Sequence, residues 1–467
     1  MQALLTQLIE LLGPDQVLTG TDVSARPTSW FDKSPMRAGA IVRPGSTEQV
    51  AALVKLCHAA GISIVPLGGM TGFVEAAIPT AAQIGLSLER LNQIEAINVD
   101  NRTVTVQAGL PLQALQEFAQ ANDLHYPVDL GARGSCTLGG MAATNAGGNE
   151  VLRYGMSREQ ILGLEVVLAT GEIVSNLRPL LKNNTGYDLK QLFIGSEGTL
   201  GIITRLSLRL RAQHSSYSTA LVAVPDFKSL TVLLRTLDAQ LGGRLSAFEV
   251  MWQEHLRFVI DHGQNHQAPL SLDYPYYVLI QAANYHDLEK DIFLSALEAM
   301  LDQEIIIDAV IASSIAQQQA LWAIRDDIEC LTTGLTPYIG YDVSLPIDAM
   351  EAYVDALTQA IRARWPEAKV IVFGHLGDGN LHLFIHIGPD LTEQERSAIN
   401  QLVYQPLAWC QGSVSAEHGI GFQKKAYLQY SRTPLEIDLM RQLKKTLDPD
   451  NIFNPGAIFD PKLTHLG

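Results

Sequence analysis

The alternation of apolar and polar positions divides the chain into two regions that predict different architectures. Residues 39–66 predict a strand, a helix and a second strand, because a period-3.6 apolar pattern separates two short apolar runs. Ser46 is the expected N-cap of that helix, Gln49 would complete a capping box, and Gly61 is the expected stop. The same reasoning predicts a helix at 111–121 and further strands at 83–88, 103–108, 161–169 and 202–210. The first 210 residues therefore predict a mixed region that opens with a β-α-β unit.

The pattern changes after a polar stretch at 211–218, which is a candidate domain boundary. Beyond it, helices are predicted at 229–240, 288–301, 315–331, 348–364 and 393–410. They are interleaved with strands predicted at 277–282, 304–311, 341–345, 370–373 and 381–386. Hairpin-joined strands with helices to one side are typical of an α+β domain with an antiparallel sheet.

Residues 371–386 form the most informative stretch of that second region. Two apolar runs flank Gly-Asp-Gly-Asn, and Asp-Gly between such runs is a strong hairpin signal. With Asp378-Gly379 as a two-residue turn, His375 is predicted directly opposite His382. Cross-strand partners share a face, with Cβ atoms roughly 4.5–5.5 Å apart, so the two imidazoles could hold one metal ion. The alternative is a pair of hydrogen-bonded histidines on a half-buried strand.

Glu417 and His418 stand between small residues in the segment 412–421, so the backbone is tight and both side chains can project into a cavity. Glu417 is a candidate third ligand beside His375 and His382. Two histidines and one carboxylate make a catalytic metal set with open positions. His418 would then stand beside the metal and could act as a base. The alternative is that the Glu-His pair is merely solvated.

Three Gly-rich segments interrupt the first region, at 67–72, 134–148 and 195–201. The first exposes backbone N–H groups and could fold as a nest around a phosphate. It is not G-x-G-x-x-G, so the NAD fingerprint does not apply. Small residues in the second let the backbone approach a large flat ligand closely, with polar contacts from Ser135, Thr137, Thr144 and Asn145. A tight turn and a crowded helix contact are the alternatives, but one extended diphosphate ligand explains all three segments together.

Composition narrows the classes of function. The 33 Lys and Arg residues against 49 Asp and Glu give a formal net charge of −16, which disfavours nucleic acid or an anionic membrane as the main partner. None of the four cysteines forms a C-x-x-C pair, which favours a reducing compartment and argues against thiolate zinc ligation. The first residues predict an amphipathic helix rather than a signal peptide, and no run of about 18 apolar residues predicts a membrane span. A cytoplasmic location is expected, with peripheral membrane association left open.

Taken together, six motifs resemble a known family. The three Gly-rich segments resemble the FAD-binding domain of the vanillyl-alcohol oxidase type. The segments 374–382, 417–419 and 451–456 resemble the FAD-linked D-2-hydroxyacid dehydrogenases, a group with D-2-hydroxyglutarate dehydrogenase, D-lactate dehydrogenase and the flavin subunit of glycolate oxidase. The motifs occur in the right order from about residue 36 to residue 460.

The resemblance implies an α+β fold, with a two-subdomain FAD-binding domain and a cap domain whose antiparallel sheet carries the substrate site. The expected domains are an N-terminal helical segment at 1–35, the FAD-binding domain at 36–212, the cap at 213–411, and a C-terminal segment at 412–467 that returns to the FAD and the active site. The resemblance also implies non-covalent FAD, and the absence of a histidine from the 67–72 loop fits this expectation. The residues expected to bind it are Pro66, Gly68, Gly69, Met70, Thr71, Gly72, Gly134, Ser135, Thr137, Gly140, Thr144, Asn145, Gly147, Gly148, Gly198, Gly201, Ile202 and Asn454.

The resemblance also implies roles at the reacting centre. A divalent metal, with zinc the expected ion, would be ligated by His375, His382 and Glu417, and it would hold the substrate hydroxyl and carboxylate. His418 would take the hydroxyl proton while C2 passes hydride to the flavin, and metal binding would make that proton easier to lose. Arg325 matches an arginine that binds the substrate carboxylate, a task that suits a guanidinium fork.

Two positions depart from the D-2-hydroxyglutarate dehydrogenase pattern. Gly340 stands where that group often has lysine, and Phe384, which shares a face with His382, stands where it tends to have asparagine. A lost cation and a lost amide make the pocket less polar. We therefore predict an FAD- and divalent-metal-dependent dehydrogenase that prefers D-lactate or a more apolar D-2-hydroxyacid, with D-2-hydroxyglutarate as the alternative substrate.

The expected partners are the small-molecule 2-hydroxyacid and a non-NAD electron acceptor such as electron-transfer flavoprotein or a quinone. A homodimer is expected by analogy alone. Two other classes of function compete. A zinc metallohydrolase would use His375, His382 and Glu417 on a water molecule, but it leaves the Gly-rich segments without a task. A non-catalytic subunit of a flavoprotein complex would be expected to have lost this ligand set.

Overall fold

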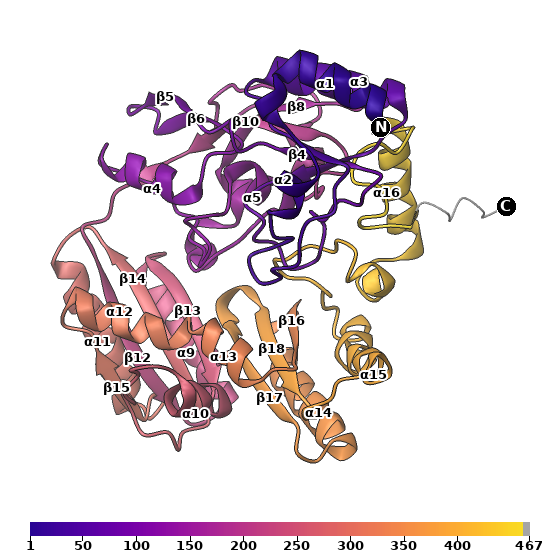
Figure 1. Ribbon diagram of the computed structural model, residues 1–467. Helices are drawn as coiled ribbons and strands as arrows, with labels where there is room; N and C mark the ends of the chain where they lie inside the picture. Colours follow the sequence, from indigo (N-terminus) through magenta and orange to yellow (C-terminus); the bar gives the residue numbers. More distant parts are fainter. Residues whose placement is uncertain (461–467) are drawn as a thin grey trace. The chain divides into compact units, whose positions relative to one another are not determined.

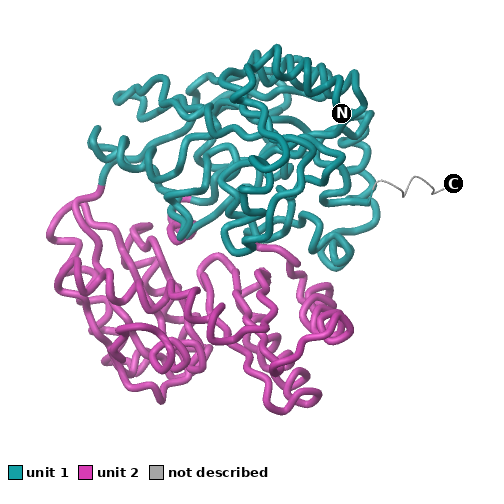
Figure 2. The backbone as a smooth tube through the Cα atoms, in the orientation of Figure 1, with its two compact units in different colours: residues 1–148, 155–213, 417–467 teal, residues 149–154, 214–416 magenta. Residues whose placement is uncertain are grey.

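The computed structural model describes residues 1–460, and the chain forms two compact units (Figure 2). Unit 1 comprises residues 1–148, residues 155–213 and the chain from Glu417 onward. Unit 2 comprises residues 149–154 and 214–416. Each unit has its own sheets and its own buried core, and each is described by itself below.

The first sheet of unit 1 has the strand order β1-β2-β4-β3, in which β2, β4 and β3 are parallel. Its strands are β1 (Val17–Leu18), β2 (Ala40–Val42), β3 (Ile64–Leu67) and β4 (Ile84–Ser87). The predicted β-α-β unit is confirmed, with α3 (Thr47–Ala60) between β2 and β3. Ser46 caps α3 as predicted, but the Gln49 side chain accepts from the N–H of Gly45, so the capping box is not completed.

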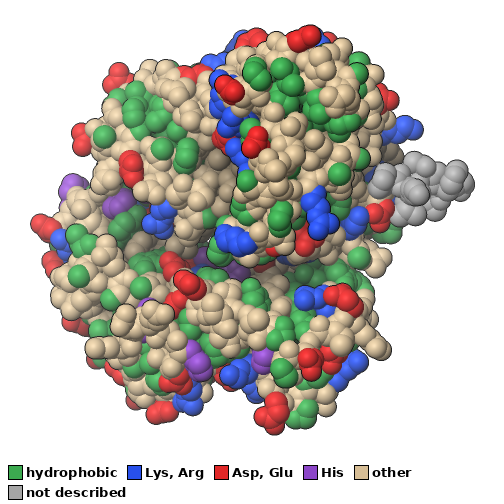
Figure 3. Space-filling view, in the orientation of Figure 1, with side chains coloured by type: hydrophobic (Ala, Val, Ile, Leu, Met, Phe, Trp, Pro, Cys, Tyr) green, Lys and Arg blue, Asp and Glu red, His purple; other side chains and the backbone are tan. Residues whose placement is uncertain are grey.

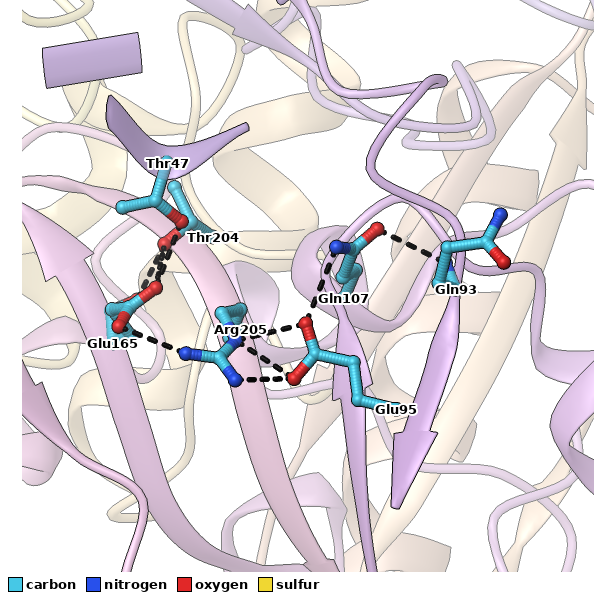
Figure 4. A network of polar contacts seen from close by, with 7 residues as sticks. All are labelled: Thr47, Gln93, Glu95, Gln107, Glu165, Thr204 and Arg205. Atoms are coloured by element: carbon cyan, nitrogen blue, oxygen red, sulfur yellow. Dashed lines mark hydrogen bonds and ion pairs between the residues drawn. The ribbon is translucent and has the colours of Figure 1, made fainter. Parts of the chain in front are cut away.

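The second sheet of unit 1 is antiparallel, with the order β5-β6-β10-β8-β9. Its strands are β5 (Ile94–Asn98), β6 (Thr103–Gln107), β8 (Ile161–Val167), β9 (Ile173–Asn176) and β10 (Ile202–Arg209). A polar network crosses this sheet (Figure 4). In it, buried Glu165 accepts from Arg205 at 3.2 Å and from Thr47 at 2.8 Å. Because Thr47 is the first residue of α3, the network joins the second sheet to the helix that follows β2.

The other elements of unit 1 complete a core shared by both sheets. Leu4 and Leu8 of the N-terminal helix are part of that core. The helices are α1 (Gln2–Leu12), α2 (Thr21–Ser24), α4 (Leu112–Gln120), α5 (Leu138–Thr144), α7 (Ser157–Gln160), α8 (Lys190–Phe193) and α16 (Pro434–Leu447); the remaining short elements are β7 (Leu124–His125), β11 (Arg211–Ala212) and the 3₁₀ turns η1 (Pro14–Gln16) and η4 (Lys425–Tyr430). The chain after α16 returns to β3, where Ile64 donates to Ile452 and accepts from Asn454.

Unit 2 is built on one antiparallel sheet, as predicted, but the sheet has seven strands because two strands at 216–224 and 245–252 were not predicted; their order is β15-β12-β14-β13-β17-β18-β16 (Figure 1). Its strands are β12 (Ser216–Val224), β13 (Leu245–Trp252), β14 (Tyr276–Asn284), β15 (Asp308–Ile311), β16 (Ile339–Ser344), β17 (Lys369–His375) and β18 (Asn380–His386). The helices are α6 (Val151–Tyr154), α9 (Phe227–Leu241), α10 (Gln253–His262), α11 (Leu288–Asp302), α12 (Ile315–Arg325), α13 (Ile328–Gly334), α14 (Ile347–Arg364) and α15 (Glu393–Tyr404), followed by the 3₁₀ turn η3 (Gln405–Ala408). Apolar side chains of α10, α12 and α13 pack against one face of the sheet.

The continuous helix predicted at 315–331 is wrong, because the chain breaks it into α12 and α13. The break is at Asp327, whose carboxylate accepts from the N–H of Cys330 and so begins a new helix. An aspartate can offer the backbone this alternative to continued helix. The break leaves Arg325 at the last position of α12, which matters for the site described below.

The predicted register of the β17–β18 hairpin is also wrong, by two residues. Phe373, not His375, lies opposite His382. The reason is the 3₁₀ turn η2 (Leu376–Asp378), which adds residues to the connection before Gly379 adopts a φ of 87°. Because the error is an even number of residues, His375 and His382 still share a face. They are diagonal neighbours with ring centroids 5.4 Å apart.

Acidic and basic side chains are interspersed on the face of the described residues shown in Figure 3, with no large field of one sign there. Among residues 1–460, no helix combines the length and the apolar character that a membrane crossing requires.

One buried histidine of unit 2 gives a stability prediction. His255 on α10 is fully buried, its ring centroid lies 4.5 Å from that of Phe373, and neither ring nitrogen has a hydrogen-bond partner among the described residues. Burial, and secondarily the charge of Arg325, lower the pKa of His255 to about 3. The folded protein therefore binds fewer protons at this residue than the unfolded chain between pH 6.5 and pH 3, so the free energy of unfolding falls as the pH falls through that window.

His255→Leu is expected to remove this penalty. The difference in free energy of unfolding between the variant and wild type should shift in favour of the variant by about 3 kcal/mol as the pH is lowered from 8 to 4.5. Urea denaturation at a series of pH values measures the gain. His286→Leu, at an exposed position, is the control and should show no such gain. A pH-independent difference between His255→Leu and wild type would contradict the prediction.

Candidate active site

Four adjacent strands of unit 2 place a row of ionisable residues side by side, referred to below as the four-strand row. His375 on β17 is the direct cross-strand partner of Glu249 on β13, and His382 on β18 is the direct partner of Asp342 on β16. Direct partners share a face of the sheet. Each histidine therefore has a carboxylate residue on one neighbouring strand and the other histidine on the other neighbouring strand.

The Glu249–His375 pair fixes the state of one imidazole. Glu249 and His375 are both buried, and Nδ1 of His375 lies 2.7 Å from a carboxylate oxygen of Glu249. Burial raises the pKa of Glu249, but the charges and hydrogen bonds of His375 and Arg325 outweigh it and hold that pKa below its usual value. An ionised Glu249 makes Nδ1 the protonated nitrogen and leaves the lone pair on Nε2, the arrangement common for metal-binding histidines.

Arg325 is bound to the same carboxylate. Its Nε and Nη2 atoms lie 2.9 Å and 2.8 Å from Glu249, and its Nη2 lies 3.3 Å from Nε2 of His375. The guanidinium also lies over the ring of Phe373, at 5.0 Å. Only 5% of the Arg325 surface is exposed, so its orientation is fixed by Glu249. Glu249 thus orients both the predicted metal ligand and the predicted carboxylate-binding residue.

An aromatic cluster lies beside His382 in the same sheet. Phe384 shares a face with His382, as predicted, and its ring stacks on Tyr338 at 5.2 Å and on Phe373 at 6.0 Å. Gly340 is the cross-strand partner of Phe384, and a Cβ atom there would meet only the Tyr338 ring, at 3.6 Å. The two positions that depart from the hydroxyglutarate pattern are therefore direct neighbours within one aromatic cluster.

Asp342 connects the four-strand row to the segment that carries the remaining candidates. Its buried carboxylate accepts from the Asn380 amide at 2.9 Å and from the N–H of Ala416 at 3.2 Å. Ala416 is the last residue of unit 2, and Glu417 is bonded to it. His375 and His382 are the two candidate ligands that unit 2 itself brings together, with ring centroids 5.4 Å apart, and the candidate third ligand Glu417 directly follows this unit in the chain.

His418 is the next residue, and within unit 1 its ring lies 4.4 Å from the ring of Phe73. Phe73 directly follows the first Gly-rich segment, so the predicted base lies next to a predicted FAD-binding loop. Phe73 is partly exposed, at 39%.

Within unit 1, the structure brings the first and second Gly-rich segments into contact. A Cβ atom at Gly69 would lie 1.9 Å from the carbonyl oxygen of Ser135, so only glycine fits there. The N–H groups of residues 69–72 find no acceptor among the described residues, and Met70 has a left-handed φ of 56°. Bare N–H groups beside a left-handed residue make a concave site for an anion such as a phosphate.

The third Gly-rich segment lies against the other two. Gly195 and Glu197 donate their backbone N–H groups to the carbonyls of Ala142 and Ala143. Gly198, with φ of 67°, would bring a Cβ atom within 2.8 Å of the Pro66 ring. Asn454 donates from its amide to the carbonyls of Ala76 and Glu197, while its own amide oxygen has no partner in the described chain although it is buried.

Several polar side chains predicted to contact FAD have structural tasks. Thr137 caps α5, Thr144 donates back to the carbonyl of Gly140, and Asn145 ends α5 in a left-handed conformation while it accepts from the N–H of Arg158. FAD contacts from these side chains remain predictions.

Glu249 and Asp342 were not predicted as site residues from the sequence. Glu249 is the only charged residue in the run 245–252, which is buried throughout. A lone carboxylate in an apolar strand costs free energy unless it is paired, and this signal could have singled it out. Its partner, however, is 126 residues away in the sequence.

Comparison with known proteins assigns the family. Residues 38–176 match the family described as "FAD binding domain", and residues 213–458 match "FAD linked oxidases, C-terminal domain". The chain belongs to the FAD-linked oxidases. This FAD-linked oxidase is 42% identical over 426 residues to a D-2-hydroxyglutarate dehydrogenase of Xanthomonas citri pv. viticola, covering 90% of this chain and 89% of the relative. It is 36% identical over 455 residues to a putative mitochondrial D-lactate dehydrogenase of Schizosaccharomyces pombe, covering 95% and 86%.

A solved structure of p-cresol methylhydroxylase shares the fold of the FAD-linked oxidase. The TM-score is 0.76 at 15% identity, with 98% of this chain and 97% of that chain covered. At an identity this low, the match shows a shared fold and nothing about function. The predicted fold class, a vanillyl-alcohol oxidase-type FAD-binding domain with an antiparallel-sheet cap, is confirmed.

Proposed function

We propose that this FAD-linked oxidase oxidises a D-2-hydroxyacid to the corresponding 2-oxoacid and passes the electrons to a non-NAD acceptor. The observation that carries the proposal is the four-strand row, in which two imidazoles stand between two carboxylate residues, with Glu417 and His418 following Ala416 along the chain. The D-2-hydroxyacid dehydrogenases named among the relatives support it. The metallohydrolase alternative has no use for the FAD-binding family match at 38–176.

The residues present fit FAD. Three Gly-rich segments meet in unit 1, the N–H groups of 69–72 are bare, and the buried oxygen of Asn454 lacks a partner. FAD, when bound there, supplies the acceptor for the hydride that leaves C2 of the substrate. The chain holds it through the backbone of these segments, without a covalent bond.

The residues present also fit a divalent metal. The donor set is two imidazoles and one carboxylate, which suits zinc, and Glu249 keeps the proton of His375 on Nδ1, so that Nε2, which accepts from Arg325 in this structure, is the nitrogen that would bind the metal. Such a metal supplies positive charge that favours loss of the substrate hydroxyl proton. Zinc is the ion we propose for His375, His382 and Glu417.

The other steps belong to the chain itself. Arg325 binds the substrate carboxylate with a guanidinium that Glu249 has already oriented, so little side-chain entropy is lost on binding. His418 accepts the hydroxyl proton. The ring of Phe73 lies against the His418 ring and restricts its orientation. Electron-transfer flavoprotein or a quinone is the acceptor class we propose, with the enzyme in the cytoplasm as a homodimer.

D-2-hydroxyglutarate is the first candidate substrate, because relatives that carry this name match most of the chain. The specific observation that favours a second candidate is the aromatic cluster of Tyr338, Phe373 and Phe384. Such a cluster suits a small or apolar side chain at C3, as in D-lactate, and offers no charged partner for a distal carboxylate.

A panel of D- and L-2-hydroxyacids with an artificial electron acceptor tests the proposed function. The purified protein should be yellow, and D-2-hydroxyacids but not their L-enantiomers should bleach its flavin absorbance under anaerobic conditions. Failure of every D-2-hydroxyacid to reduce the flavin would reject the proposal. The ratio of kcat/KM for D-2-hydroxyglutarate and D-lactate decides between the two candidates.

Phe384→Asn combined with Gly340→Lys is expected to raise the kcat/KM ratio of D-2-hydroxyglutarate to D-lactate by about 10-fold, because an amide and a cation replace an apolar surface. Lysine fits at residue 340, where a Cβ atom meets only ordinary contact. Phe384→Leu is the matched control, since it removes the ring without adding polarity, and it should leave the ratio within threefold. An unchanged ratio in the double variant would contradict a role for these positions in specificity.

A further inference from the structure

One buried carboxylate of unit 1 is used by nothing described so far. Glu197 lies in the third Gly-rich segment and is only 7% exposed. One of its carboxylate oxygens accepts from the backbone N–H of Ile420 at 2.7 Å, and the other accepts from the N–H of Gly421 at 2.7 Å. These two residues end the segment 417–421, here named the His418 turn, which begins with the predicted ligand Glu417 and the predicted base His418.

The backbone of Glu197 is held as firmly as its side chain. Its N–H donates to the carbonyl of Ala143 in the second Gly-rich segment, at 2.8 Å. Its own carbonyl accepts from the Asn454 amide at 3.0 Å. Three parts of the predicted FAD site therefore meet at this one residue, and it is hydrogen-bonded on both sides.

Glu197 also occupies a backbone conformation that disfavours it. Its φ is 52°, in the left-handed region where glycine is the usual residue, and Gly198 follows it. Glutamate at such a position costs free energy, which the two hydrogen bonds of its carboxylate can offset. The turn it binds is equally constrained, because a Cβ atom at Gly419 would lie 2.7 Å from the Glu197 carboxylate.

We propose that Glu197 is a positioning residue, which fixes the His418 turn and thereby holds Glu417 and His418 in register with the segments that bind FAD. This proposal rests on the proposed function, since it takes His418 as the base. Among the described residues, Glu197 makes no hydrogen bond to Glu417 or His418; it acts through the backbone of Ile420 and Gly421.

The chemistry of the site requires a carboxylate. Two N–H groups converge on two oxygens, so both atoms at the end of the side chain must accept hydrogen bonds. A glutamine side chain would accept one N–H and direct its own NH₂ group at the other. Burial raises the pKa of Glu197, and the N–H groups of Ile420 and Gly421, then the charge of Lys424, act in the opposite direction. A buried carboxyl with this cost is consistent with a functional task.

Glu197→Gln in the purified holoenzyme tests the proposal. We expect kcat with the best D-2-hydroxyacid of the panel to fall 10- to 100-fold, with KM changed less than threefold and with FAD and metal contents unchanged. The pH at which kcat is half-maximal should shift by at least half a unit, because the environment of His418 changes. Hydrogen exchange of the Ile420 and Gly421 amides should become at least 10-fold faster.

Two further variants keep the test decisive. Glu165→Gln is the matched control, because Glu165 is a buried, hydrogen-bonded carboxylate of the same unit that lies in another network. It should lower the melting temperature but leave KM, the pH profile and exchange at 420–421 unchanged. If Glu197→Gln fails to fold with FAD, Gly419→Ala disturbs the same turn without removing the charge, and it should show the same loss of kcat and the same pH shift.

The outcomes separate this proposal from the function on which it rests. Wild-type kcat and pH profile in Glu197→Gln or, where that variant does not fold, in Gly419→Ala would overturn the positioning role. So would effects no different from those of Glu165→Gln. If no D-2-hydroxyacid reduces the flavin of the wild-type protein, the proposed function is rejected. In that case hydrogen exchange of the amides at 420–421 still measures whether Glu197 holds the turn.

Discussion

His418→Asn is expected to lower kcat with a D-2-hydroxyacid by about 10²- to 10⁴-fold, the range that a positioned general base contributes. Asparagine can occupy the same space beside Phe73 and can hydrogen-bond, but its amide cannot accept a proton near neutral pH. The backbone of the His418 turn, held by Glu197, should stay in place. FAD content and metal content are therefore expected to match wild type, so the loss is confined to the chemical step.

Rapid mixing of the oxidised variant with substrate under anaerobic conditions measures this loss as the rate of flavin reduction. The acidic limb of the wild-type pH profile should disappear in His418→Asn, because the group that must be deprotonated is gone. Phe73→Leu serves as the control, since it alters the packing of the His418 ring but keeps the base, and its rate should fall less than 10-fold. Flavin reduction in His418→Asn within threefold of wild type would assign the proton to another group.

Most helices and strands could be predicted from local sequence patterns. The site could be predicted only in part, because its contacts join residues that are distant in sequence. The β-α-β unit, the antiparallel sheet of unit 2 and the placing of His375 and His382 on one hairpin all follow from periodicity and turn residues. The register of that hairpin was wrong because the 3₁₀ turn η2 lengthened the connection. Turn chemistry alone does not reveal whether Gly379 ends a two-residue turn or a longer one.

Glu249 shows the second limit most clearly. It belongs to β13, which pairs with β17 across more than a hundred residues of sequence. Nothing local to residues 245–252 tells which strand will lie beside it. The strand order β13-β17-β18-β16 had to be known before the four-strand row could be recognised. The same holds for Asp342, whose pairing with His382 depends on β16 being the edge strand.

The segment that carries Glu417 and His418 is held at both ends by buried carboxylates. Within unit 2, Asp342 accepts from the N–H of Ala416; within unit 1, Glu197 accepts from Ile420 and Gly421. Gly419 and Gly421 adopt positive φ values of 83° and 50°, which lets the chain turn between the two supports. A catalytic segment of this kind gains precision from its supports rather than from its own secondary structure.

Removal of the proposed metal is expected to abolish turnover and leave FAD in place, because the proposed ligands His375, His382 and Glu417 are distinct from the Gly-rich segments. Incubation with a chelator followed by gel filtration should lower kcat/KM more than 100-fold, and zinc added in equal amount should restore it. Metal analysis and the flavin spectrum follow the two cofactors separately. Full activity in metal-free protein would contradict the ligand assignment.

Glu249→Gln tests the same ligand set by weakening metal binding instead of removing the metal. The variant loses the carboxylate that keeps the proton on Nδ1 of His375, so the chelator concentration that removes half of the metal should fall 10- to 100-fold. Asp326→Asn is the matched control, because it removes a different carboxylate partner of Arg325 and leaves His375 untouched. Its metal affinity should equal that of wild type. Equal affinity in Glu249→Gln would mean that the orientation of His375 comes from the strands alone, through the β13–β17 register.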